Sequence, residues 1–173
     1  MLAYIFLLVA VVIRFLPHPF AFTPVAASLL FFGARGPRRQ AWVPLTLLAV
    51  SDVVLTTVVY AYPFSVDHFV TWIWYAAVLW LGTNLRENLR PLRVIFAALA
   101  SSVSFFLVSN FAVWAAWNMY PKNLDGLMMS YAAALPFFRR AVAGDLFFTC
   151  VMFATPVLLH HLANARKNRE QDA

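Results

Sequence analysis

The sequence predicts an all-α integral membrane protein, folded as one bundle of about six transmembrane helices. Composition is the first reason: hydrophobic residues make up 63% of the 173 residues and charged residues 12%, against about 25% charged residues in soluble domains. Pattern is the second, because the apolar residues form runs of up to helical spanning length, about 20 residues, between short polar connections. The third is that no strand-like alternation of apolar and polar residues occurs.

The apolar runs give the order of the helices. They cover residues 1–16, 22–34, 41–60, 66–85, 94–117 and 141–162. The second run is short for a span. A further apolar stretch, 127–135, is shorter still, and we expect Pro136 to end it as a short extra helix that half-spans the membrane or lies on its surface. We therefore assign residues 1–162 to a transmembrane domain and 163–173 to a polar cytoplasmic tail.

The connection between the first two runs is rich in proline. Pro17, Pro19 and Pro24 each lack a backbone donor and disfavour helix in the preceding residue, so they predict a stiff reversal of the chain. His18 lies between two of them. We expect this reversal to cover a layer of polar groups, with His18 above it.

Basic residues predict the orientation. The connections after the second, fourth and sixth runs are the richer in Lys and Arg, which places them and both termini in the cytoplasm. The net charge of +6 is then explained by topology, and we expect no nucleic-acid partner. Arg139 and Arg140 lie at the outer mouth of the last run, against this rule, which suggests another role for them.

Four polar residues lie in the outer half of the predicted spans, each on a different helix: Arg14, Asp52, Asn110 and Asp145. A charge at mid-bilayer costs roughly 2.5–3.5 kcal/mol on insertion scales, so such groups should face the interior and find partners. Arg14 could pair with Asp145 or with Asp52. Two interpretations remain open, which do not exclude each other: an ion pair that fixes helix packing, or a ligand cavity open to the outside.

Aromatic residues are also more frequent on the outer side. Many of them belong to the interfacial belt of Trp and Tyr, but the asymmetry also suits the stacking of a flat ring. The candidate ligand-binding residues are therefore Arg14, His18, Asp52, Asn110, Trp114, Tyr120, Tyr131, Arg139 and Asp145.

Other kinds of site find little support. No Ser/His/Asp or Cys/His arrangement, phosphate-binding glycine loop or HExxH motif is present, so we expect neither an enzyme nor a bound cofactor. His18 and His68 both lie on the outer side and could meet in a haem or metal site, but no third ligand at helical spacing accompanies them. Cys150 lies in an apolar run and gives no information about disulfides.

Several short motifs resemble those of a family of small, functionally uncharacterised bacterial membrane proteins. That family is itself similar to the substrate-binding (S) components of energy-coupling-factor transporters. The motifs are Arg14-Phe-Leu-Pro-His-Pro, Phe22-Thr-Pro-Val, Phe32-Gly33, Ser51-Asp52, Asn110-Phe111, Tyr120-Pro121, Ala134-Leu-Pro-Phe-Phe138 and Gly144-Asp145. The resemblance implies six helices in the bacterial cytoplasmic membrane, a vitamin-like ligand held near the outer face, and a membrane coupling subunit with two cytoplasmic ATPases as partners. The first run departs from the pattern, because it lacks the small residues spaced by four that serve those components in docking.

The sequence thus favours a substrate-binding membrane component for uptake of a small vitamin-like or heterocyclic nutrient. The alternative is a structural or accessory subunit of a larger membrane complex, respiratory or photosynthetic. In that case the intramembrane charges would be internal ion pairs.

Overall fold

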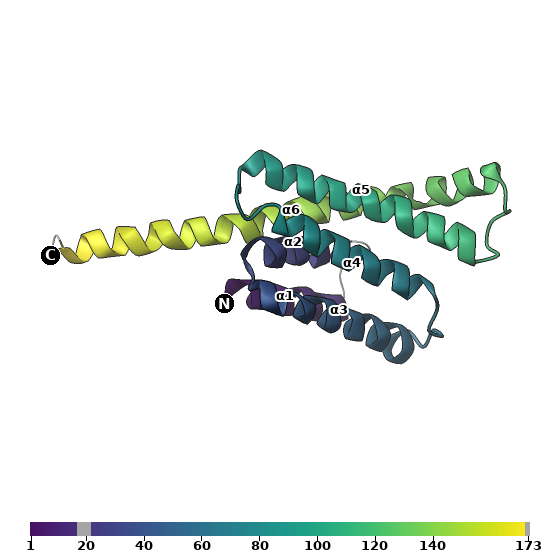
Figure 1. Ribbon diagram of the computed structural model, residues 1–173, viewed down its shortest axis with the longest axis horizontal. Helices are drawn as coiled ribbons and strands as arrows, with labels where there is room; N and C mark the ends of the chain where they lie inside the picture. The colour runs from purple at the N-terminus through teal and green to yellow at the C-terminus, as the bar shows by residue number, and fades with distance from the viewer. Residues whose placement is uncertain (17–21, 172–173) are drawn as a thin grey trace.

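The computed structural model describes residues 1–16 and 22–171, and all its regular elements are helical. They are α1 (Leu2–Phe15), α2 (Val25–Arg35), α3 (Trp42–Val54), α4 (Asp67–Thr83), α5 (Pro91–Ala116) and α6 (Leu124–Gln171). A 3-10 turn, Arg38–Gln40, precedes α3, and a π-helical turn, Leu55–Val59, continues it. The helices run back and forth, so both termini lie at one end of the bundle (Figure 1).

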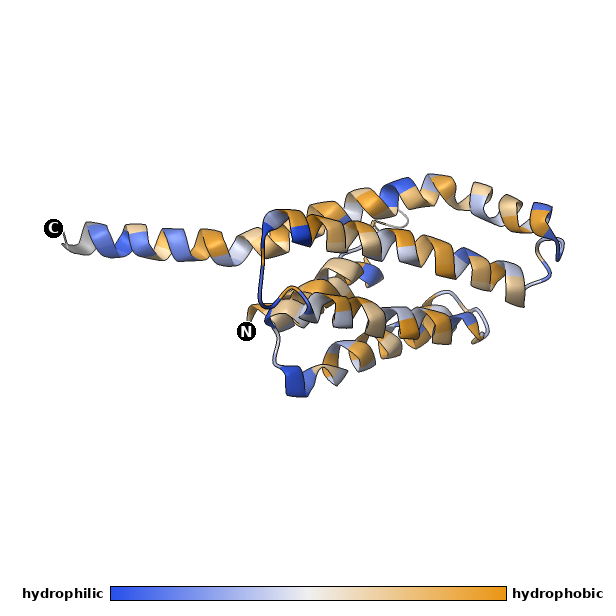
Figure 2. Ribbon diagram, turned by 45° about the horizontal axis from the view of Figure 1, so that its top comes forward, coloured by the Kyte–Doolittle hydropathy of each residue, from blue (hydrophilic) through white to orange (hydrophobic). Residues whose placement is uncertain are grey.

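The apolar surface of the bundle is that expected of a helical membrane protein. Three helical segments are long and apolar enough to cross a membrane: Arg38–Val59, Pro91–Ala116 and Leu124–Asn168. Hydrophobic residues run along the ribbons, whereas hydrophilic residues gather in the loops and along the last turns of α6 (Figure 2). Large apolar side chains such as Trp80 and Phe96 are more than half exposed, which suits contact with lipid rather than water.

The short helix α2 is the centre of the core. All ten residues from Val25 to Ala34 are buried, and α1, α4, α5 and α6 all contact it. Eleven residues span only about 16 Å at 1.5 Å per residue, too little to cross a bilayer alone. A helix this short can lie inside a membrane protein when neighbouring helices surround it, because the unpaired backbone groups at its ends need protein partners in an apolar medium. At its C-terminal end, Arg86 donates a hydrogen bond to the Gly36 carbonyl, at 2.6 Å.

Two glycines allow α2 and α4 to touch backbone to backbone. A Cβ atom on Gly33 would lie 2.3 Å from the Leu79 carbonyl oxygen and 2.8 Å from Gly82 Cα. A Cβ on Gly82 would lie 2.5 Å from the Leu30 carbonyl oxygen. Close approach through small residues is a common way for membrane helices to associate.

The structure corrects the prediction of a short extra helix before the last span. Residues 127–135 and the last run belong to a single 48-residue helix, α6, with Pro136 and Pro156 inside it. Contacts with α5 on both sides of Pro136 hold the helix in place: the Tyr131 hydroxyl donates to the Leu107 carbonyl at 2.9 Å, and the rings of Phe138 and Phe106 are 4.5 Å apart. Proline inside a membrane helix is tolerated where neighbouring helices support it.

The polar tail continues α6 without a break at residue 163, and its last described turns extend beyond the rest of the bundle (Figure 1). At the opposite end, α5 and α6 reach well past α1 and α2 (Figure 1). The proline-rich reversal and His18 fall in residues 17–21, outside the described residues.

Candidate ligand-binding cavity

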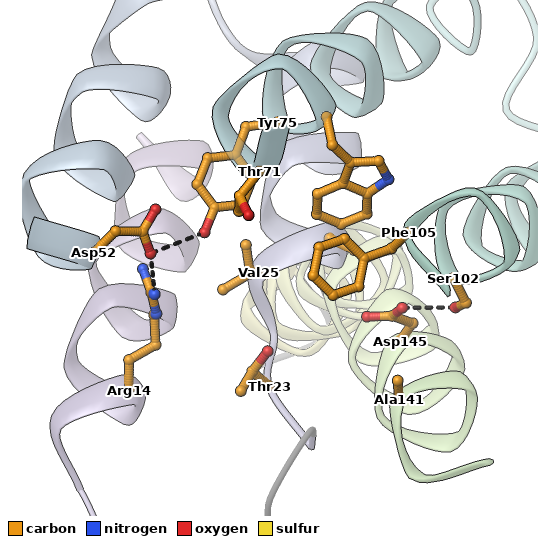
Figure 3. A pocket seen from close by; sticks show the side chains of 12 residues that line it. Arg14, Thr23, Val25, Asp52, Thr71, Tyr75, Ser102, Phe105, Ala141 and Asp145 are labelled. Carbon is orange, nitrogen blue, oxygen red and sulfur yellow. Dashed lines mark hydrogen bonds and ion pairs between the residues drawn. The ribbon is translucent and has the colours of Figure 1, made fainter. Parts of the chain in front are cut away.

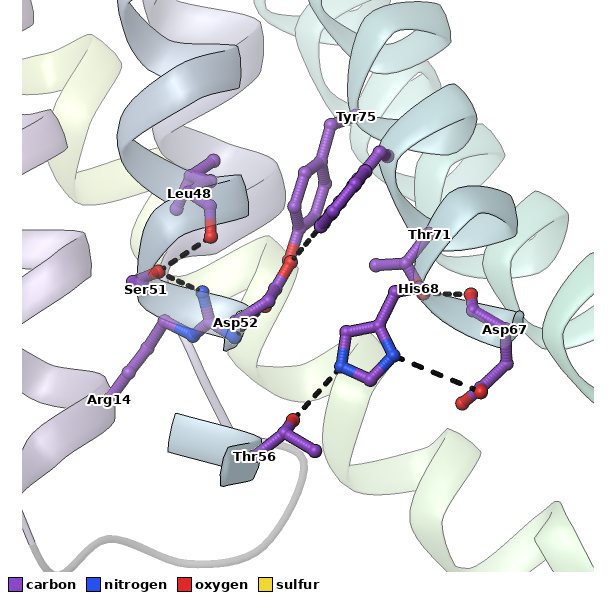
Figure 4. A network of polar contacts seen from close by, with 10 residues as sticks. Arg14, Leu48, Ser51, Asp52, Thr56, Asp67, His68, Thr71 and Tyr75 are labelled. Carbon is purple, nitrogen blue, oxygen red and sulfur yellow. Dashed lines mark hydrogen bonds and ion pairs between the residues drawn. The ribbon is translucent and has the colours of Figure 1, made fainter. Parts of the chain in front are cut away.

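Asp52 on α3 is the centre of a buried polar network. Arg14, one residue before the end of α1, forms an ion pair with it and donates to the Ser51 hydroxyl at 2.5 Å. From α4, the Trp72 indole N–H and the Tyr75 hydroxyl donate to the Asp52 carboxylate at 2.9 and 3.1 Å (Figure 4). The Arg14 and Asp52 side chains are only 15% and 8% exposed, so each charge depends on the other.

This network joins three helices and satisfies the carboxylate. Because Asp52 already accepts hydrogen bonds on both oxygens, it is a structural anchor that fixes α1 and α4 to α3. Of the two partners that the sequence allows for Arg14, the structure therefore selects Asp52. The interpretation as an ion pair that fixes packing describes these two residues well.

Asp145 has a different environment. It lies on α6 and is 8% exposed, and the Ser102 hydroxyl of α5 contacts its Oδ2 atom at 2.6 Å. No other hydrogen bond or ion pair reaches this carboxyl group in the described part of the chain. Its second oxygen points away from Ser102 into the space between the helices (Figure 3).

A cavity of about 360 Å³ separates the two groups. Arg14 and Asp52 line one side and Asp145 with Ser102 the other, while Phe105 lies between them (Figure 3) and Trp74 also lines the cavity. The two aromatic rings have centroids 4.6 Å apart. The remaining lining residues are Thr23, Val25, Ala26, Thr71, Tyr75 and Ala141. The volume lies in the range of roughly 300–1,000 Å³ of small-molecule sites, and apolar walls with a few polar groups are typical of them.

Five candidate residues from the sequence lie outside this cavity. Asn110 lines a neighbouring hollow of about 200 Å³ between α5 and α6, which shares Ser102, Phe105 and Ala141 with the cavity. The Asn110 amide donates to the Phe106 carbonyl of its own helix, at 2.8 Å. Trp114 and Tyr131 donate to backbone carbonyls at the α5–α6 corner. Tyr120 lies in the connection at that corner, and Arg139 is exposed on α6.

His68 has structural partners on both ring nitrogens. Nε2 lies 3.0 Å from the Thr56 hydroxyl (Figure 4), and Nδ1 lies 3.0 Å from the Ser65 carbonyl. This arrangement ties the π-helical turn to the start of α4, which leaves neither nitrogen available for a haem iron. Among the described residues, no three His, Cys, Asp or Glu side chains are grouped as a metal site would require.

The cavity contains several residues that the sequence analysis did not assign to a site. Trp74, Tyr75, Ser102 and Phe105 are the important ones. Helical spacing offered a signal: Thr71, Trp74 and Tyr75 follow the i, i+3, i+4 rule on one helix face. Ser102 and Phe105 lie three apart on the next helix.

The fold and the cavity together define a class of protein: an all-helical bundle of membrane character with a largely apolar cavity that contains a few polar groups. Comparison with known proteins gives the family. The chain belongs to the family of unknown function DUF6580, which matches residues 1–167. No curated protein and no solved structure matches the chain.

Proposed function

We propose that this protein is a substrate-binding membrane component for the uptake of a small heterocyclic nutrient, and that the ligand lies in the cavity between Asp52 and Asp145. The observation that carries the proposal is the Asp145 carboxyl group, which belongs to a residue only 8% exposed, bonds Ser102 through one oxygen and lines a space large enough for a small molecule. A carboxyl oxygen that faces a largely apolar cavity can accept a hydrogen bond from a ligand donor, and hydrogen bonds to charged groups are among the stronger ones.

The charges around the cavity suggest the chemistry of the ligand. Arg14 and Asp52 neutralise each other, so among the described lining residues Asp145 is the one ionisable group without a counter-ion. A ligand with one positive charge, or with an N–H donor, would complement it. Trp74 and Phe105 offer faces for a flat ring and for a cation over its π-electrons.

The proposed orientation places the cavity toward the outside of the cell. The loops rich in arginine lie at the end that holds both termini (Figure 1), whereas Arg14, which lines the cavity, lies near the other end of α1. The sequence contains no ATP-binding motif, so the energy for uptake would come from a partner or from an ion. A membrane coupling subunit with cytoplasmic ATPases is the partner set that the sequence resemblance implies.

One observation favours the alternative, an accessory subunit of a larger membrane complex. The last turns of α6, with Arg166 and Lys167, extend beyond the bundle as a helix, where a neighbouring subunit could bind. In that case the cavity would be a packing defect and not a site.

Mass spectrometry of the small molecules and proteins that co-purify in mild detergent separates the two functions. Uptake predicts a bound small molecule together with ATPase and coupling subunits. A fixed set of other subunits, without a small molecule, would favour the accessory role and contradict uptake.

The ligand class has its own test. Asp145→Asn keeps the shape of the side chain and removes its charge, and it should weaken binding of a cationic ligand by about tenfold or more. Asp125→Asn, an exposed carboxylate at the start of α6, is the matched control and should bind like the wild type. Equal binding by Asp145→Asn would contradict a cationic ligand.

A further inference from the structure

Three arginines gather where α2 ends, at the opposite end of the bundle from the cavity. Arg35 is the last residue of α2, Arg38 follows in the next turn, and Arg86 reaches the Gly36 carbonyl between them. Burial lowers the pKa of Arg86, and the nearby charge of Arg38 lowers it further. Within the described residues, no carboxylate forms an ion pair with any of the three, and the Arg86 Nε atom is buried without a hydrogen-bond partner. The group therefore favours an anion.

Two hollows lie on either side of Arg35. The larger, about 420 Å³, lies between α5 and α6 and is lined by Val94, Ile95, Phe153, Ala154 and neighbouring apolar residues. The smaller, about 320 Å³, lies between the start of α1 and the loop after α2. Phe31 and Arg35 line both. Two apolar spaces thus diverge from one cationic side chain.

We infer that this end of the bundle binds one anionic phospholipid, with its phosphate on Arg35 and one acyl chain in each hollow. An anionic phospholipid has one negatively charged phosphate and two apolar acyl chains. The site has a matching arrangement, with one arginine between two apolar hollows. A free phosphate would satisfy the arginine and leave both hollows empty. Basic pockets at the membrane surface are a known mode of anionic-lipid binding, and the predicted orientation places this one in the cytoplasmic leaflet, where such lipids are abundant.

The start of α5 adds to the attraction for phosphate. Pro91, its first residue, and Leu89 just before it line the larger hollow beside Arg35. Pro91 has no N–H, and the Arg93 and Val94 N–H groups both donate to the Arg90 carbonyl, so the attraction here comes from the positive end of the helix dipole, which favours a phosphate. Arg35 and the N-terminal end of a 26-residue helix therefore border the same space. This inference does not depend on the proposed uptake function.

Native mass spectrometry of the full chain in detergent tests the site. The protein is titrated with phosphatidylglycerol and with phosphatidylcholine of identical acyl chains. The wild type should prefer phosphatidylglycerol, and Arg35→Gln should reduce that preference about fivefold, the effect of one basic side chain near an anionic leaflet. Arg39→Gln is the matched control, because Arg39 is an exposed arginine of the same loop that lines neither hollow.

A second variant tests the acyl chains with every arginine in place. Ala154→Trp fills the larger hollow and should reduce binding of phosphatidylglycerol at least as much as Arg35→Gln does. Equal binding of the two lipids by the wild type would overturn the inference. An equal loss of preference in Arg39→Gln would also overturn the inference, because it would indicate attraction by diffuse surface charge. Displacement of the lipid by inorganic phosphate, or unchanged lipid binding in Ala154→Trp, would overturn the inference as well.

Discussion

Removing either member of the buried Arg14–Asp52 pair should destabilise the protein, and by different amounts. Asp52→Leu leaves Arg14 with only the Ser51 hydroxyl, and it also removes the acceptor of Trp72 and Tyr75. Arg14→Met leaves Asp52 with both of those donors. Breaking a buried ion pair costs about 3–5 kcal/mol, so we expect Asp52→Leu near the upper end and Arg14→Met near the lower end.

The double variant gives the sharper result. With both charges gone, apolar side chains fill the space between α1 and α3, and replacing a buried pair in this way is often close to neutral. We expect the loss in the double variant to be smaller than the sum of the single losses by about 3 kcal/mol, the upper range of coupling between contacting residues.

Equilibrium unfolding in mixed detergent micelles measures these free energies. Arg39→Met serves as the control for removing an arginine from an exposed position, where changes are usually within about 0.5 kcal/mol. Additive losses in the double variant would refute the pairing, and so would a larger loss for Arg14→Met than for Asp52→Leu.

Three further predictions follow from the packing. Gly33→Ala should lower the melting temperature, because its Cβ would lie 2.3 Å from the Leu79 carbonyl oxygen and overpacking costs typically about 1–3 kcal/mol. The control Ala100→Leu, on the exposed face of α5, should leave the melting temperature unchanged. An unchanged melting temperature for Gly33→Ala would contradict the close contact of α2 with α4. His68→Ala should speed hydrogen exchange at the Tyr60 and Tyr62 amides, which donate to the Leu55 and Thr56 carbonyls, and leave exchange in α5 unchanged. Exchange at these two amides as slow as in the wild type would show that His68 does not stabilise the π-helical turn. Lys122→Met should increase hydrogen exchange in the last turn of α5, where the lysine Nζ donates to the Ala115 and Trp117 carbonyls at 3.1 and 2.6 Å. Exchange equal to that of the wild type would show that Lys122 does not cap this helix.

The sequence predicted where the polar groups lie along the helices better than how they pair. Counting 1.5 Å per residue places Arg14, Asp52 and Asp145 in the same half of the bundle, and all three line one cavity. Depth alone does not choose between two aspartates at similar levels, because the choice depends on which helices are neighbours. The selection of Asp52 required the arrangement of α1 beside α3.

Proline was the main source of error in the fold. The rule that proline ends a helix holds for isolated chains in water, whereas Pro136 lies in a helix that α5 supports on both sides. The central place of α2 was also beyond sequence reasoning. Its short length indicated an unusual helix, but burial of every residue from Val25 to Ala34 follows from four neighbouring helices that contact it.

The central claim, that the cavity between Asp52 and Asp145 holds a small molecule, is tested most directly by counting ligand in a variant that fills the space. Ala141 lines the cavity, so Ala141→Trp would occupy it, while Ala100→Trp adds the same side chain on an exposed face of α5. After purification in mild detergent and denaturation, mass spectrometry should find about one small molecule per chain in the wild type and in Ala100→Trp, and almost none in a folded Ala141→Trp. The same yield from Ala141→Trp as from the wild type would contradict the claim.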